Sequence, residues 1–334
     1  MMCLATALVS CQDKKHENYV PLHADTTVAC DDSLLNVQKI MTLGNGRILA
    51  FTNTAEPFAS IIDIKTGAIM RRTLHNGEGP GEYIWPRLAK GYKDNRVCIS
   101  DLSSGKISIV DIEADSTVKE LNTSRYGTVD GVVNVSDGRY VVHMQGTEKR
   151  FGIIENDSMI RTFDIPYPCE SNISPTQAAI VYQGGILGHP YENKIVHYSR
   201  YGKVLELFEY DLGKCDLHRY AAISETGPRY WGETDEYEVS GRLKPDNTIG
   251  FTNGCATESA IYLLFSGKRM NDPNVQRTDI IEVYDWNGEH MCSYKLDKPL
   301  TDIAVHNDSL IGIGESDERY HISVYNLNID HKSL

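Results

Sequence analysis

Five acidic or amide side chains near the ends of β-prone runs are the first candidates for chemistry. They are Glu78, Glu82, Asp130, Asn253 and Asp302. Carboxylate and amide oxygens are the ligands that Ca²⁺ prefers, so these residues could hold a calcium ion if the fold brought them together. Acids and amides are also the commonest turn residues, and we therefore keep a calcium site as the alternative interpretation.

Cysteine and histidine show no pattern that indicates a metal centre or a nucleophile. The chain has eight cysteines and 11 histidines but no CxxC, HxH or HExxH combination. Zinc sites and many catalytic groups are recognised by such spacings. The pattern favours a protein that binds a partner over a protein that catalyses a reaction.

A glycine-rich stretch at residues 75–83, HNGEGPGEY, superficially resembles a phosphate-binding loop. Pro80 lacks an amide donor, the carboxylates of Glu78 and Glu82 would repel phosphate, and no amphipathic helix follows. The glycines instead permit a tight crossing between two strands. We interpret this stretch as structural.

Aromatic and basic residues gather in the long connections between the β-prone runs. The residues that we predict to contact a ligand are Tyr83, Trp85, Tyr230, Trp231, Lys268 and Arg269. Exposed aromatic rings suit stacking on sugars or anchoring of a partner protein. An equally weighted alternative is that these side chains pack the connections onto the strands.

The elements that must position these residues are β-strands. Residues 280–296, IIEVYDWNGEHMCSYKL, contain two β-rich runs joined by Asn287-Gly288, the dipeptide most typical of a type I′ hairpin turn. The first run ends in two apolar residues and an acid. Similar endings lie at 61–63, 109–111, 153–155 and 324–326, and a less strict one lies at 209–211. A repeat of about 40 to 50 residues built from short strands is typical of propeller blades.

The sequence therefore predicts an all-β, six-bladed β-propeller with four-stranded antiparallel blades. The sixth blade lacks a fourth strand, and the β-prone run at residues 26–30 stands outside the first blade. We expect this N-terminal strand to close the ring, because closure removes exposed strand edges. Blade four is expected to begin with a strand at residues 179–182, and the whole propeller to span residues 23–334.

The N-terminus predicts export to the cell envelope. Residues 1–10 are short and apolar, and Leu8-Val9-Ser10-Cys11 resembles the lipobox of bacterial lipoproteins, in which the cysteine is lipidated. The composition then becomes polar. We predict a signal peptide at 1–10, lipidation of Cys11 and a tether at 11–22.

The charge balance limits the possible partners. The 46 acidic and 33 basic residues give a formal net charge of −13, which disfavours nucleic acid as a partner. No apolar run approaches the roughly 20 residues that a membrane-spanning helix needs, so we expect membrane contact through the lipid anchor alone.

Several motifs together resemble one family. The stretch Gly77–Tyr83, the run Ile261–Gly267, the hairpin Val283–Gly288 and the N-terminal lipobox are similar to those of the TolB-like six-bladed β-propeller lipoproteins of Bacteroidetes-type bacteria. The resemblance implies the propeller fold and a location in the cell envelope. We expect the lipid anchor to lie in the outer membrane, with the propeller facing the periplasm or the cell surface. It implies no established activity.

We therefore predict a monomeric, non-catalytic lipoprotein that binds or scaffolds a protein or glycan partner and needs no cofactor. The alternative is a calcium-dependent hydrolase or lactonase-like propeller enzyme with its metal in the central channel. Sequence spacing leaves this alternative open, because a propeller channel draws one side chain from each blade.

Overall fold

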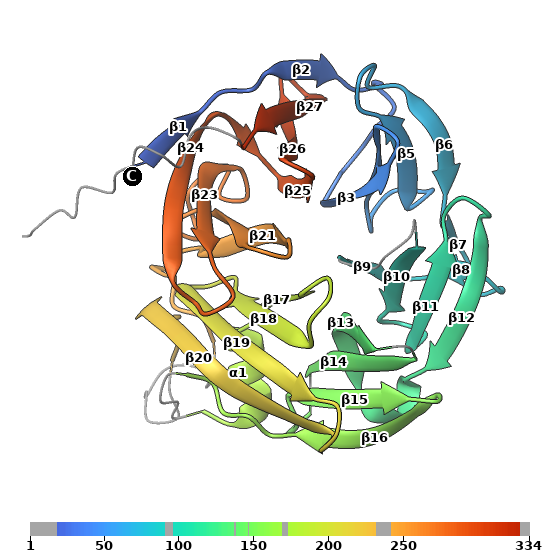
Figure 1. Cartoon of the computed structure of the whole chain (residues 1–334), viewed down its shortest axis with the longest axis vertical. Coiled ribbons are helices and arrows are strands. Elements are labelled where there is room, and N and C mark those ends of the chain that lie inside the picture. Colours follow the sequence, from blue (N-terminus) through green and yellow to red (C-terminus); the bar gives the residue numbers. More distant parts are fainter. Residues whose placement is uncertain are drawn as a thin grey trace, which may run out of the picture.

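The protein forms a ring of β-sheets around a central axis (Figure 1). Cavities lined by the inner strands lie along this axis, and we call them the channel. The computed structural model describes residues 19–90, 96–136, 138–145, 147–168, 173–231 and 242–327. These residues form six sheets of four or five strands, which are the blades, and a short pairing of β7 (His75–Asn76) with β8 (Glu82–Tyr83). The predicted six-bladed β-propeller is confirmed.

The first three blades each run from an inner strand at the channel to an outer strand at the rim, with antiparallel pairing throughout. Blade one comprises β3 (Lys39–Gly44), β4 (Arg47–Phe51), β5 (Ala59–Asp63) and β6 (Ile69–Thr73). Blade two comprises β9 (Pro86–Ala89), β10 (Arg96–Asp101), β11 (Lys106–Asp111) and β12 (Ser116–Asn122). Blade three comprises β13 (Thr128–Ser136), β14 (Arg139–Gln145), β15 (Phe151–Glu155) and β16 (Ser158–Phe163). A short 3₁₀ helix, η1 (Ser124–Tyr126), precedes blade three.

The last three blades repeat this order. Blade four comprises β17 (Gly184–Gly188), β18 (Lys194–Ser199), β19 (Lys203–Asp211) and β20 (Asp216–Thr226). Blade five comprises β21 (Phe251–Ala256), β22 (Ile261–Phe265), β23 (Thr278–Tyr284) and β24 (His290–Leu300). Blade six takes β25 (Asp302–His306), β26 (Ser309–Ser316) and β27 (Arg319–Asn326) from the C-terminal part of the chain.

The N-terminal strands close the ring. β2 (Thr26–Ala29) pairs antiparallel with β27 and becomes the outer strand of blade six, as the sequence predicted. β1 (Tyr19–Leu22) pairs in parallel with β24 and adds an unpredicted fifth strand to blade five. The propeller thus starts within the segment predicted as a tether, because Leu22 is buried in the core between blades five and six.

Hydrophobic packing joins each blade to both of its neighbours. Side chains alternate between the two faces of a strand, so Leu49 and Phe51 of β4 pack against blade two while Ile48 and Ala50 pack against blade six. Every junction between adjacent blades holds such a cluster of buried side chains. This two-sided burial explains why the middle strands are nearly continuous apolar runs.

The connection into blade four differs from the prediction. Residues 179–182, expected to form its inner strand, overlap the end of helix α1 (Pro175–Val181), and the strand follows as β17. The Ser174 hydroxyl accepts a hydrogen bond from the Gln177 backbone N–H, and the Gln177 side chain accepts one from the Ser174 N–H at 3.2 Å. This capping box, followed by a proline at the first helical position, starts a helix. Among the described residues, no helix is long and apolar enough to cross a membrane.

The hairpin between β23 and β24 forms as predicted but with a different turn. Gly288 has a positive φ of 90°, whereas Asn287 does not have a positive φ, and a type I′ turn needs one at both central residues. The Asp285 carboxylate accepts hydrogen bonds from the N–H groups of Asn287 at 2.9 Å and Glu289 at 2.8 Å. These bonds fix the turn that the chain adopts.

Ring closure by β1 and β2 predicts the effect of an N-terminal deletion. A chain that starts at Cys30 lacks both strands, and we expect a lower thermal midpoint and aggregation, because the edges of β24 and β27 are then unpaired. Loss of the buried Leu22 side chain alone corresponds to about 2 to 5 kcal/mol. Calorimetry and size-exclusion chromatography would measure both effects.

A chain that starts at Tyr19 is the matched control, because it keeps both strands and should melt like the full chain. Equal thermal midpoints for the two shortened chains would contradict closure by these strands.

Candidate functional site

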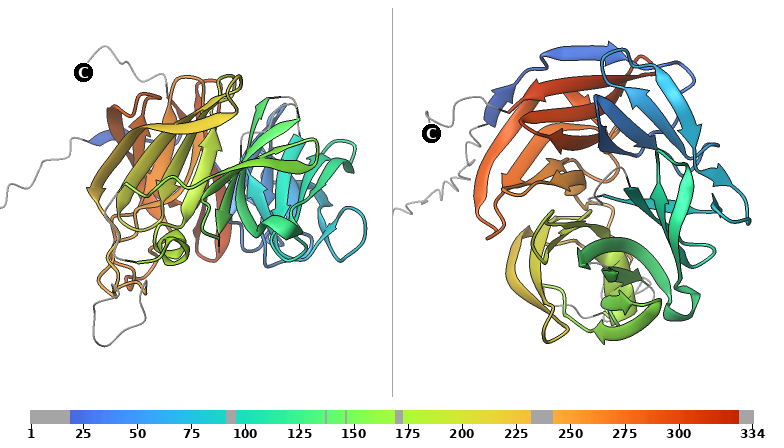
Figure 2. Two further views of the ribbon diagram at one scale, coloured as in Figure 1. Left: turned by 90° about the horizontal axis from the view of Figure 1, so that it is seen from below. Right: turned by 45° about the vertical axis from the view of Figure 1, so that its right-hand side comes forward.

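A polar cavity of about 440 Å³ lies at the end of the channel where the inner strands begin. We call it the channel mouth. Every blade contributes to its wall, in chain order through Gln38, Arg87, Asp130, Gly185, Thr252 and Thr301. Helix α1 and the connections that lead into β17 and β21 lie at the same end of the ring (Figure 2). The fold thus brings side chains that are distant in sequence into one space.

Three cationic side chains line the channel mouth. Lys39 is on β3, Arg87 is on β9 and Arg200 directly follows β18. Lys39 donates from Nζ to the Leu88 carbonyl at 2.9 Å, and the Arg87 guanidinium lies 5.4 Å from the centre of the Trp85 ring. Within the described part of the chain, neither arginine has a carboxylate within ion-pair distance.

Burial and neighbouring cations lower the pKa of two of these groups. Burial is the main cause that lowers the pKa of Lys39 to about 8, and the charges of Lys90 and Arg87 act in the same direction. Burial also lowers the pKa of Arg87, against the charge of Asp130 and with a smaller contribution from the charge of Arg200. Arginine stays protonated in proteins, so the mouth has two permanent positive charges and a third on Lys39 that is lost above about pH 8.

The carboxylates on the channel wall are already engaged. Asp130 Oδ1 lies 2.7 Å from His143 Nδ1, and its other oxygen accepts a hydrogen bond from Gln145. Deeper in the channel, Asp302 is fully buried and its Oδ1 lies 2.6 Å from Lys90 Nζ. The pair of Lys90 and Asp302 ties blade two to blade six across the channel.

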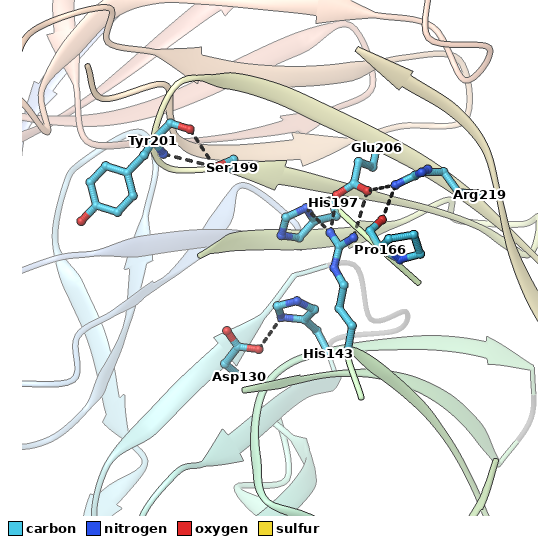
Figure 3. A network of polar contacts seen from close by, with 9 residues as sticks. Asp130, His143, Pro166, His197, Ser199, Tyr201, Glu206 and Arg219 are labelled. Atoms are coloured by element: carbon cyan, nitrogen blue, oxygen red, sulfur yellow. Dashed lines mark hydrogen bonds and ion pairs between the residues drawn. The ribbon is translucent and has the colours of Figure 1, made fainter. Parts of the chain in front are cut away.

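Next to the channel mouth, a buried ionic network joins blades three and four (Figure 3). Arg150 Nη1 donates to Glu206 Oε1 at 2.9 Å, and Arg219 donates to the same oxygen at 2.8 Å. His197 Nδ1 lies 3.1 Å from Glu206 Oε2, and the His197 and His143 ring centres are 5.1 Å apart. The network runs from His143 near the channel to Arg219 on the outer strand β20.

The charge states of Glu206 and His197 are fixed at neutral pH. Burial opposes ionisation of Glu206, but the charge and hydrogen bonds of Arg150 outweigh burial and hold the pKa of Glu206 below its usual range. Burial, aided by the Arg150 charge, lowers the pKa of His197 to about 4, so its imidazole is neutral. A carboxylate held by two guanidinium groups therefore joins the two blades.

Two of the predicted ligand-binding residues lie in the connection into blade two, and they differ in accessibility. Trp85 is 48% exposed and its ring stands beside Arg87, which lines the channel mouth, whereas Trp85 itself is not part of the cavity wall. Tyr83 is fully buried in the core between blades one and two. This burial favours loop packing as the role of Tyr83.

The other four predicted ligand-binding residues lie in the connections before and within blade five. Tyr230 packs against the hydrophobic cluster around α1, and Lys244 Nζ lies 4.4 Å from the centre of the Trp231 ring. Lys268 donates to two carbonyl oxygens of its own connection, and Arg269 is exposed. In the described structure none of these four lines the channel mouth.

The five candidate calcium ligands fall into two groups. Asp130 and Asn253 line the channel mouth and Asp302 lies deeper in the channel, whereas Glu78 and Glu82 lie in the 75–83 stretch, away from the cavity wall. No group of three or more His, Cys, Asp or Glu residues within the described ranges could hold a metal ion. The fold thus does not bring the five candidates together.

The cations of the channel mouth were not among the predicted site residues. A usable signal was present in the sequence, because Gln38-Lys39, Arg87 and Asp130 place polar residues at the start of inner strands that are otherwise apolar. Arg200 follows an apolar strand and gives no such signal.

A family model described as TolB-like 6-blade propeller-like matches residues 58–308. The chain belongs to this TolB-like propeller family. The match begins before β5 of blade one and ends within blade six, so it covers most of the ring of this TolB-like propeller. No curated protein matches the sequence.

Solved structures share the fold of this TolB-like propeller at low sequence identity. A Bacteroides fragilis protein described as exported has a TM-score of 0.52 at 13% identity, covering 90% of this chain and 93% of that chain. A hydrazine synthase chain of Kuenenia stuttgartiensis has a TM-score of 0.51 at 10% identity, covering 89% and 97%. The Cps50 (Swd1) β-propeller domain of Myceliophteria thermophila has a TM-score of 0.50 at 8% identity, covering 89% and 99%. These similarities show the fold alone, because propellers host many unrelated functions.

The buried network predicts a large stability effect at Glu206. The variant Glu206→Gln leaves Arg150 buried without its counter-charge, and we expect a loss of about 3 to 5 kcal/mol in urea unfolding at neutral pH. Because the folded state lowers the pKa of Glu206, the advantage of the wild type should shrink as the pH falls below about 4.

The variant Glu209→Gln on the same strand is the matched control. The Glu209 side chain is 51% exposed and lies 3.6 Å from His218, and surface pairs of this kind contribute about 0 to 1 kcal/mol. Equal losses in the two variants would show that the network does not hold blades three and four together.

Proposed function

We propose that this TolB-like propeller is a non-catalytic binding or scaffolding module whose protein or glycan partner places a group in the channel mouth. The observation that carries the proposal is the convergence of side chains from all six blades on one space of about 440 Å³. Ligand sites in proteins are commonly concave spaces of about 300 to 1,000 Å³ with a few placed polar groups.

The rigidity of the wall supports a binding role. Lys39, Arg87 and Asp130 are carried by inner strands, and these strands are held by hydrogen bonds within their blades and by packing between blades. A site built on such strands loses little conformational freedom when a partner binds, which favours affinity. Trp85 beside Arg87 adds an exposed aromatic surface at the rim.

Filling the channel mouth tests this role. The variant Gln276→Trp places a large side chain at a half-buried lining position, and we expect at least about tenfold weaker binding to any glycan or peptide that binds the wild type on printed arrays. Trp85→Ala should also weaken binding, without lowering the thermal midpoint.

The variant Met70→Trp is the matched control, because it adds the same side chain at a 58% exposed position on the outer strand β6. Unchanged binding by the Gln276→Trp protein would contradict a role for the channel mouth, as would failure of the wild type to bind any array member.

We also propose that the chain is an envelope lipoprotein, lipidated on Cys11, anchored to the outer membrane and active as a monomer. Residues 1–18 lie outside the described residues, so support comes from the Leu8–Cys11 lipobox pattern and from the similar Bacteroides fragilis protein, which is described as exported. The net charge of −13 disfavours nucleic acid as a partner.

Lipidation predicts the outcome of cell fractionation. The wild type should remain with the membrane fraction and Cys11→Ala should become soluble, because two acyl chains give stable anchoring. Cys292→Ala, which removes a free cysteine of the folded ring, is the control and should behave like the wild type. Equal solubility of the wild type and Cys11→Ala would refute the anchor.

A further inference from the structure

The charge of the channel mouth is opposite to the charge of the chain. The whole sequence has a formal net charge of −13, whereas the channel mouth has three cations, Lys39, Arg87 and Arg200, and one carboxylate, Asp130. His143 and Gln145 already occupy both oxygens of that carboxylate. Asp130 still attracts Arg87 and Lys39 through space, but within the described structure no carboxylate lies within ion-pair distance of any of the three cations.

Two buried cations elsewhere in the described structure each form an ion pair with a carboxylate, unlike the cations of the channel mouth. Lys90 is paired with Asp302, and Arg150 is paired with Glu206. Arg87 and Arg200 instead repel each other, and burial and this repulsion lower the pKa of Arg87 although the charge of Asp130 acts in the opposite direction. Like charges in a confined space destabilise the protein until an anion enters. Two neighbouring guanidinium groups are well suited to bind a carboxylate.

Neutral side chains around the cations can recognise hydroxyl groups. Carboxamides line the mouth at Gln38, Gln145, Gln183, Asn253 and Gln276. Each carboxamide presents a donor and an acceptor, and those of Gln38 and Gln276 make no hydrogen bond within the described part of the chain. A sugar presents many hydroxyl groups that both donate and accept, so it matches this wall better than an apolar ligand does.

We propose that the channel mouth binds an acidic glycan, with the carboxylate of a sugar acid held by Arg87, Arg200 and Lys39 and its hydroxyl groups held by the glutamine side chains. The inference rests on the proposed function, in which the partner enters the channel mouth. The exposed Trp85 beside Arg87 offers a flat apolar face to the next sugar ring at the rim.

Matched sugars test the proposed ligand class. D-galacturonate and D-galactose differ only at C6, where one has a carboxylate and the other an alcohol, and D-glucuronate and D-glucose form a second such pair. Isothermal titration calorimetry of the whole chain at low salt should detect at least one of the acids, at millimolar ligand concentration, and neither neutral sugar. The affinity should fall with added salt, because salt screens the charges.

Variants of the cations locate the binding. Arg87→Gln and Arg200→Gln should each weaken binding of the acid by about tenfold or more, the effect of losing a hydrogen bond to a charged group. Arg161→Gln is the matched control, because Arg161 is 46% exposed on the outer strand β16, and it should leave the affinity unchanged.

The possible failures can be told apart. Equal binding of the acid and the neutral sugar, together with unaltered affinity in both arginine variants, would overturn the acidic-glycan inference. The proposed function would still stand if Gln276→Trp abolished that binding. Binding that survives Gln276→Trp overturns both. Failure of both acids to bind overturns the inference, and tighter binding of triglutamate than of either acid assigns the mouth to an acidic peptide instead.

The titration of Lys39 gives a second readout. Its pKa of about 8 is set by burial and by the charges of Lys90, Asp302, Arg87 and Asp130, and the charged form predominates below that pH. Affinity for the sugar acid should therefore fall as the pH rises from 7 to 9, and Lys39→Met should bind more weakly at pH 7 and lose this pH dependence. A flat profile in the wild type would remove Lys39 from the proposed site.

Discussion

Burial on both faces is the constraint on which this structure depends. The inner and middle strands carry apolar side chains on both sides, as Ile48 and Leu49 show by packing against opposite neighbours, so no blade can be stable alone. Only a closed ring gives each blade two partners. The chain meets this requirement by returning its N-terminal strands to the blades that its C-terminal strands leave open, with β2 completing blade six and β1 extending blade five.

Closure also determines where charge can lie. Inner strands surround a channel that is partly sheltered from water, and a charged side chain there needs a counter-charge or access to solvent. Two buried pairs meet this need: Lys90 with Asp302 across the channel, and Arg150 with Glu206 between blades three and four. Both pairs join residues of different blades and leave neither partner uncompensated.

The channel mouth departs from this rule. Its arginines face one cavity without a carboxylate partner in the described structure, on a wall otherwise rich in carboxamides. A protein that needed these residues only for stability would be better served by neutral side chains, because like charges in a cavity oppose folding. Unpaired cations of this kind are typical of binding sites, where residues are kept for the ligand at some cost in folding stability. The surrounding blades keep the wall of the cavity rigid.

The sequence by itself determined the number of blades, most of their strands and the closure by the run at residues 26–30, because nearly continuous apolar β-rich runs and repeated strand endings are local patterns that survive in any context. It did not reveal helix α1, although Ser174 and Gln177 carried its capping signal, since a short apolar segment suits a strand equally well. The sequence placed polar residues at the start of several inner strands, but only the tertiary structure showed that they share one cavity. Lys39, Arg87 and Arg200 come from three different blades, and only the angle at which closed blades meet sets which strand ends face one another across the channel.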